Sequence, residues 1–197
     1  MDTKKEGFFV KYPNGIKKQV QNSFSHSNRG MNLEADINDT NEYYIENNIA
    51  IIHKKPTPIT INKVDYKSRK DAVIKEAHFK TPSTTDYNGI YKGKYIDFEA
   101  KETKSCTSFP LNNIHKHQIE HLSKIVEHGG IGFIIVKFTK LDITYLLFEK
   151  DLVRFIENEK RASIPLSYFE ENGYIIKEKL RPRLDYLKII NEKGVVL

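Results

Sequence analysis

The feature that most constrains the fold is the stretch of residues 82–101, PSTTDYNGIYKGKYIDFEAK, which is typical of a β-hairpin with a defined register. Lys92-Gly93 suits a two-residue turn, because glycine readily adopts a positive φ. With the turn at this position, the numbers of facing residues sum to 185. The register therefore predicts that Asp86 on one strand lies opposite Glu99 on the other.

The same register predicts one chemical face and one core face. Since side chains alternate along a strand, Asp97, Glu99 and Lys101 share a face, and Thr84 lies opposite Lys101. The alternate residues, which we expect in the core, are Ile96, Phe98 and Ala100. Facing carboxylates at Asp86 and Glu99 destabilise a sheet unless something compensates for their charge. A divalent cation is the simplest compensation, and the alternative is a solvated outer face neutralised by lysines.

This face carries the groups that metal-dependent hydrolysis of a phosphate ester requires. Two carboxylates and a hydroxyl supply the oxygen ligands that hard cations prefer, and an ammonium lies beside them. Asp86, followed after twelve residues by Glu99-Ala100-Lys101, resembles the D-x(n)-E-x-K signature of the PD-(D/E)XK nuclease superfamily. Longer strings, between about Asn28 and Asn191, resemble RecU-type Holliday-junction resolvases: residues 55–59 (KPTPI), 64–66 (VDY), 82–87 (PSTTDY) and 95–103 (YIDFEAKET).

The resemblance implies a function and a set of site residues. We expect an endonuclease that resolves four-way DNA junctions by paired symmetric nicks during homologous recombination, DNA repair and chromosome segregation. Its cofactor would be Mg²⁺, with Mn²⁺ as a substitute, bound by Thr84, Asp86, Glu99 and Gln118. Lys101 would act beside the metal as the catalytic cation.

The sequence is also compatible with other functions and with further metal ligands. A non-cleaving junction-binding recombination accessory protein and a duplex-cutting nuclease of the same fold are the alternatives. Glu34 on a predicted helix is a candidate accessory ligand or an ordinary surface glutamate, and Asp97 is a candidate to support the site. His117 and His121 form an i, i+4 pair, but no third zinc ligand follows at a matching spacing.

The basic charge is concentrated in two segments. The chain has a net charge of +6 and a pI of about 9.1, while residues 1–30 carry six Lys/Arg against two acids and residues 54–80 carry eight against three. Clustered cations of this kind favour a polyanion such as DNA over a merely solvated surface. The residues that we expect to contact DNA are Arg29, Lys54, Lys55, Lys63, Lys67, Arg69 and Lys70.

The order of the elements predicts a single α/β domain with a mixed central sheet flanked by helices, which the resemblance implies is restriction-endonuclease-like. We expect a flexible basic arm at residues 1–28 and a nuclease domain at 29–197. Within that domain, residues 54–80 read as a protruding basic β-like insertion, which is a stalk in the resembled family; a disordered loop is the alternative. The other expected elements are helices near 32–47, 114–128, 150–159 and 184–190, and strands at 49–52, 132–138, 143–148 and 174–176, with a break at Pro165.

Partners and location follow from symmetry and composition. Two symmetric nicks require two active sites, so we expect a homodimer, with recombinase or branch-migration proteins as further partners. The chain has one cysteine and no long apolar run, which predicts a cytoplasmic protein without disulfides or a membrane segment.

Overall fold

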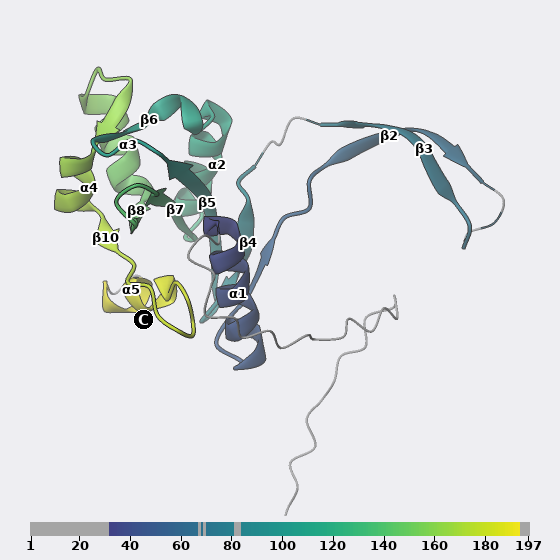
Figure 1. Cartoon of the computed structure of the whole chain (residues 1–197), viewed down its shortest axis with the longest axis horizontal. Coiled ribbons are helices and arrows are strands. Elements are labelled where there is room, and N and C mark those ends of the chain that lie inside the picture. The colour runs from purple at the N-terminus through teal and green to yellow at the C-terminus, as the bar shows by residue number, and fades with distance from the viewer. Residues whose placement is uncertain (1–31, 67, 69, 81–83, 194–197) are drawn as a thin grey trace, which may run out of the picture. The chain divides into compact units, whose positions relative to one another are not determined.

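The computed structural model describes residues 32–66, 68, 70–80 and 84–193 (Figure 1). Three of the expected features lie outside these residues, namely the basic arm at 1–28, Arg29, and the DNA contacts at Lys67 and Arg69.

A six-stranded sheet forms the centre of the domain, with the strand order β1-β4-β5-β7-β8-β10. Only β5 and β7 run parallel, and the other neighbouring pairs are antiparallel. The sheet is therefore mixed, as the sequence predicts. Its strands are β1 (Ile51–Lys54), β4 (Tyr87–Tyr91), β5 (Lys94–Thr103), β7 (Ile131–Phe138), β8 (Ile143–Phe148) and β10 (Tyr174–Ile175).

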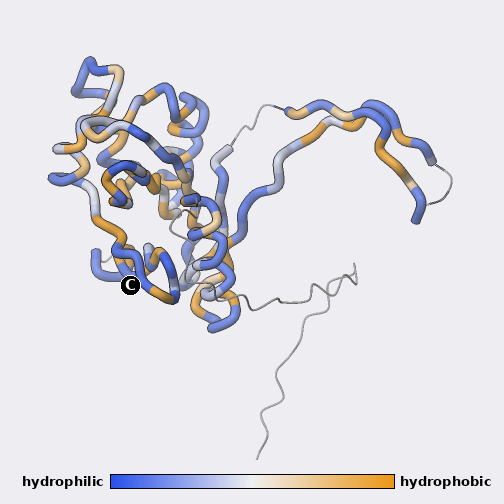
Figure 2. The backbone as a smooth tube through the Cα atoms, viewed as in Figure 1, coloured by the Kyte–Doolittle hydropathy of each residue, from blue (hydrophilic) through white to orange (hydrophobic). Residues whose placement is uncertain are grey.

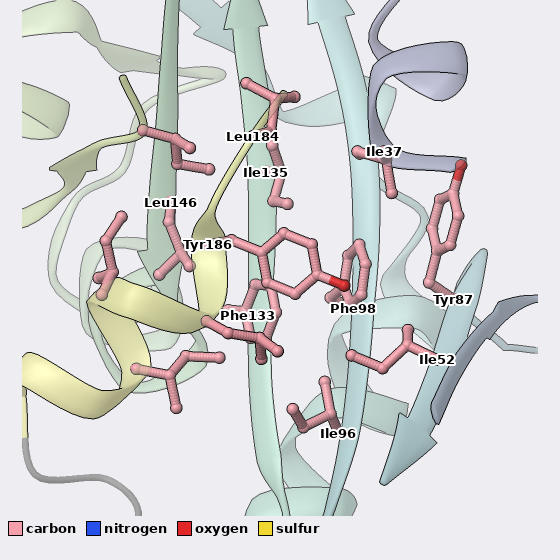
Figure 3. Close-up of a cluster of buried hydrophobic side chains, with 14 of the residues drawn as sticks. Ile37, Ile52, Tyr87, Ile96, Phe98, Phe133, Ile135, Leu146, Leu184 and Tyr186 are labelled. Atoms are coloured by element: carbon pink, nitrogen blue, oxygen red, sulfur yellow. The ribbon is translucent and has the colours of Figure 1, made fainter. Parts of the chain in front are cut away.

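Helices cover the two faces of this sheet over separate hydrophobic cores. The first core packs α1 and α5 against alternate residues of β5 and β7, among them Phe98 and Phe133 (Figure 3). The second packs α2, α3 and α4 against the opposite face, where Ile134 and Val136 point. The helices are α1 (Leu33–Glu46), α2 (Lys116–Glu127), α3 (Glu149–Asn158), α4 (Leu166–Asn172) and α5 (Tyr186–Glu192), with a 3₁₀ turn η1 (Leu111–Asn113) before α2.

The hairpin of β4 and β5 has the register that the sequence predicts. Lys92 and Gly93 have φ values of 46° and 75°, as a tight primed turn requires. The ladder runs from the Tyr91–Lys94 pair to the Tyr87–Phe98 pair, so facing residues sum to 185. Asp86 and Glu99 form the next facing position, immediately beyond the ladder.

Two strand predictions need correction. The strand expected at 49–52 begins at Ile51 and is an edge strand, so Ile52 is buried whereas Ile51 is 56% exposed. The expected break at Pro165 is instead the end of a short strand, β9 (Ser163–Pro165), which pairs with β6 (Ser108–Pro110) and leads directly into α4. The pairing partner of β9 is remote in sequence, which is why the local pattern missed it.

The insertion between β1 and β4 forms its own two-stranded sheet. β2 (Ile59–Asp65) pairs with β3 (Val73–Phe79) antiparallel, and every residue of both strands is exposed. Hydrophobic and hydrophilic residues both occur along it (Figure 2). The expected β-like structure is therefore present in place of a loop.

The described helices include none that is long and apolar enough to span a membrane.

Phe98 provides a test of the sheet core. Its ring stacks between those of Tyr87 and Phe133, with centroids 4.8 and 4.7 Å apart, and it is fully buried. Phe98→Ala should lower the free energy of unfolding by about 3–5 kcal/mol, because it removes the central ring of the stack and leaves a cavity. Urea denaturation measures this loss. Phe79→Ala, the same change at a residue 82% exposed, should stay within about 0.5 kcal/mol of wild type; equal losses would contradict the assignment.

Candidate active site

The acidic side chains of β5 point toward the face of the sheet that α2, α3 and α4 cover. Asp97, Glu99 and Lys101 alternate with Phe98 along the strand, and both carboxylates are completely buried. α2 packs against β5 and β7 on this side. On the same face, Ile51 of β1 and Ile90 of β4 are 56% and 51% exposed, so solvent reaches the sheet beside the acids.

Asp86 and Glu99 meet as the register predicts. The backbone N–H of Asp86 donates a hydrogen bond of 3.1 Å to Oε2 of Glu99. The other oxygen of Glu99, Oε1, forms an ion pair with the ammonium of Lys101. Three residues of the D-x(n)-E-x-K pattern are thus brought together.

The surroundings of the Glu99 carboxyl group raise its pKa. The pKa of Glu99 is raised to about 7, because burial and the nearby Asp86 carboxyl group raise it more than the Lys101 ammonium lowers it. The ionised form of a buried carboxylate beside another acid is destabilised by the loss of hydration and by charge repulsion. A cation bound next to it would offset both costs.

The residues present fit a divalent metal. Within the described residues, Oε1 of Glu99 is buried and lacks a hydrogen bond of good geometry, although it contacts Lys101. An ionised oxygen left in this state, beside a second carboxylate, is suited to a hard cation. No three His, Cys, Asp or Glu side chains of the described ranges gather around one point, so two carboxylates would need neutral oxygen ligands to complete the coordination.

The two neutral ligands expected from the sequence are placed differently. Thr84 is partly exposed and lies two residues before Asp86. This position is outside the β4–β5 ladder, so the ladder does not include the expected pairing of Thr84 with Lys101. Gln118 is 3% exposed, and its Oε1 accepts a 3.0 Å hydrogen bond from the backbone N–H of His115 at the start of α2. The second lone pair of that oxygen is the one left for a metal.

Glu34, the candidate accessory ligand, lies on the first turn of α1. Its carboxylate pairs with Lys54 at 2.5 Å, and its side chain is 54% exposed. It also lines a surface cleft together with Asp86, Tyr87 and Glu102. α1 is fixed here because Oε1 of Glu102 accepts a 2.6 Å hydrogen bond from the N–H at its first residue. Glu34 therefore lies in the same cleft as Asp86, and its carboxylate pairs with Lys54.

Asp97 is the centre of a polar network that the sequence did not reveal. Its Oδ2 lies 2.8 Å from the ammonium of Lys55, 3.1 Å from the hydroxyl of Tyr95 and 3.2 Å from Nε2 of His121. Its Oδ1 accepts a hydrogen bond from Thr85. Tyr95 could have been found, since it precedes Asp97 by two residues on the same face. Lys55 and His121 come from distant segments and gave no local signal, whereas Thr85 lies in the hairpin stretch itself, 12 residues before Asp97.

The structure also shows the contacts of the two histidines and of four lysines that we expect to contact DNA. His121 contacts Asp97, whereas Nε2 of His117 is buried with no hydrogen-bond partner in the described part of the chain, so the pair does not share a contact. Lys63 and Lys70 are exposed in the insertion. Lys54 pairs with Glu34, and Lys55 points inward to Asp97 rather than to solvent.

Comparison with known proteins identifies relatives over most of the chain. Residues 28–192 match the family RecU, recombination protein U. The chain is 53% identical over 194 residues to the Holliday junction resolvase RecU of Bacillus mycoides (strain KBAB4), covering 92% of this chain and 96% of the relative. The proteins of the same name from Bacillus cereus (strain B4264) and Bacillus thuringiensis (strain Al Hakam) are 51% and 52% identical, with the same coverage.

The raised pKa of Glu99 predicts a pH-dependent cost to stability in the metal-free protein. Because the folded state holds this proton more tightly than the unfolded state, the cost is absent below about pH 4.5 and complete above about pH 7. Glu99→Gln should therefore raise the free energy of unfolding at pH 8 by up to about 3 kcal/mol, and much less at pH 5. Urea denaturation in EDTA at both pH values measures the difference.

The matched control is Glu120→Gln, which changes an exposed glutamate of α2. It should leave stability within about 0.5 kcal/mol at either pH. A gain from Glu99→Gln that is the same at pH 5 and pH 8 would contradict the raised pKa.

Proposed function

The chain belongs to the RecU family, and on this premise we propose that it is a metal-dependent endonuclease that resolves four-way DNA junctions by paired nicks. Its relatives are named Holliday junction resolvases, and the chain covers 96% of their length. The observation that carries the proposal is the contact of Asp86 and Lys101 with the buried carboxylate of Glu99. This arrangement matches the needs of phosphodiester hydrolysis.

Asp86 and Glu99 would hold Mg²⁺, or Mn²⁺ in its place, with Thr84 and Gln118 as neutral oxygen ligands. The bound metal supplies Lewis acidity to the scissile phosphate and lowers the pKa of a water molecule. Lys101 would either orient the attacking water or stabilise the negative charge that develops on the phosphate. The water oxygen would form a new bond to phosphorus as the bond from phosphorus to the ester oxygen breaks; the water would lose a proton to solvent, and the leaving oxygen would take one from solvent.

The rest of the chain would present the DNA. The β2–β3 hairpin lies in the segment 54–80, whose excess of five positive charges suits a stalk that contacts the phosphates at the centre of a junction. Residues 29–197 would form one restriction-endonuclease-like nuclease domain. Two such domains in a homodimer would provide the two active sites that paired nicks require.

Cleavage of synthetic DNA tests the proposed function. A labelled four-way junction and an equal-length duplex are incubated with the protein, each with and without Mg²⁺ at matched salt. We expect nicks in both opposing strands of the junction, only with Mg²⁺. Binding without cleavage would support a junction-binding accessory protein, and equal cutting of the duplex would support a general nuclease.

Lys101→Ala should lower the cleavage rate by at least about a hundredfold while leaving junction binding in Ca²⁺ within about threefold. The reason is that the ammonium acts on the reacting phosphate, whereas most binding energy comes from other phosphate contacts. Lys124→Ala removes an equal charge from the exposed last turn of α2 and should leave the rate unchanged. Cleavage at a near wild-type rate by Lys101→Ala would contradict the assigned role.

The double variant Lys63→Gln/Lys70→Gln tests the role of the insertion. Each lysine that neutralises a phosphate adds about one to the slope of the logarithm of affinity against the logarithm of salt concentration. The slope for junction binding should therefore fall in magnitude by about two. Lys124→Gln should not change it, and an unchanged slope in the double variant would place these lysines away from the DNA.

A further inference from the structure

Lys55 lies where the chain leaves β1 for the β2–β3 hairpin, yet its side chain turns back to the sheet. Only 18% of that side chain is exposed, compared with 39% for its neighbour Lys54. Its ammonium lies 2.8 Å from Oδ2 of Asp97 and 3.0 Å from Oγ1 of Thr85. A residue whose charge is directed inward in this way is poorly placed to bind a phosphate.

The backbone of Lys55 makes a second link to the site. Its N–H donates a 2.7 Å hydrogen bond to the carbonyl oxygen of Asp86. The N–H of Asp86 in turn donates to Oε2 of Glu99. Asp86 is thus held through both of its peptide groups, by Lys55 on one side and by Glu99 on the other.

Thr85 closes this arrangement. Its hydroxyl donates to Oδ1 of Asp97 and accepts from the ammonium of Lys55. Residues 55 and 85 are the two ends of the segment that contains the β2–β3 hairpin. Both ends bind the buried carboxylate of Asp97. Asp97 itself is fixed in the middle of β5, two residues before Glu99.

We propose that Lys55 is a positioning residue for the metal site: through Asp97 and Thr85 it holds Asp86 in place against Glu99. The inference rests on the proposed function for the identity of that site. Without the ammonium, the buried charge of Asp97 keeps only Thr85, Tyr95 and His121 as partners, and breaking a buried ion pair on one side is strongly destabilising. The strand end at residues 85–86 would then move away from Glu99.

The position of Lys55 also connects the hairpin to the catalytic residues. The base of the hairpin is closed by a 3.0 Å hydrogen bond from the N–H of Lys80 to the carbonyl oxygen of Pro58. Pro58 is three residues from Lys55, so Lys55 lies next to the base of the hairpin.

Amide hydrogen exchange of the metal-free protein, followed by NMR in EDTA, tests the placement of Asp86 directly. Lys55→Met keeps the length of the side chain but removes its charge, and it should speed exchange of the Asp86 amide at least tenfold while leaving the Phe98 amide inside the sheet unchanged. Lys54→Met removes the neighbouring charge, which pairs with Glu34, and should change neither exchange rate.

Two further variants keep the test decisive if Lys55→Met does not fold. Thr85→Val removes one link to Asp97 but preserves the ion pair, and it should speed exchange of the Asp86 amide about threefold. Lys55→Arg retains the charge and should bring the exchange rate back toward that of wild type.

Binding of Mn²⁺ without DNA, measured by electron paramagnetic resonance, gives a second readout. Lys55→Met should weaken Mn²⁺ binding about tenfold, as loss of an outer-shell partner commonly does. Because Lys55 acts through Asp97, adding Lys55→Met to Asp97→Asn should weaken binding by less than a further threefold.

Unchanged exchange at Asp86 in Lys55→Met would overturn the proposal, and so would weaker junction binding with wild-type Mn²⁺ affinity. The proposed function fails separately, if the wild-type protein does not cut junctions with Mg²⁺. In that case the exchange rate at Asp86 still decides the role of Lys55.

Discussion

The burial of the Glu99 carboxylate is the constraint on which the arrangement of the site depends. A carboxylate removed from water must be paired, hydrogen-bonded or neutralised. Here it receives a backbone N–H from Asp86 and the ammonium of Lys101, yet its pKa is still raised to about 7. The compensation is incomplete, which is the electrostatic condition under which a bound cation is strongly favoured.

The core on the other face of the sheet makes that burial possible. Phe98 lies between Asp97 and Glu99 in sequence and packs in the opposite direction, stacked between Tyr87 and Phe133. Because the period of a strand is two, a slip of one residue would place both Asp97 and Glu99 in the hydrophobic core and turn Phe98 out of it. The aromatic stack and the tight turn at Lys92-Gly93 therefore set the position of the proposed catalytic residues.

Sequence reasoning succeeded where the interactions are local. The register of the hairpin follows from one turn, and the first helix, expected near 32–47, spans Leu33–Glu46. It failed where a residue depends on distant partners. The inward direction of Lys55 is set by Asp97, 42 positions later in the chain, so no local pattern indicates it. β9 was missed for the same reason, since it pairs with β6.

The contrast between the two buried acids of β5 separates their roles. Asp97 has a partner for each oxygen, from Lys55, Thr85, Tyr95 and His121, and its contacts hold separate segments together. Glu99 has an oxygen that, among the described residues, lacks a well-formed hydrogen bond. A satisfied buried carboxylate fixes structure, because exchanging its partners for a ligand would cost free energy. The partners of Glu99, which include Lys101, leave its pKa raised to about 7, so it would gain from a bound cation; this contrast supports the proposed metal site at Glu99 and the proposed support of the strand ends by Asp97.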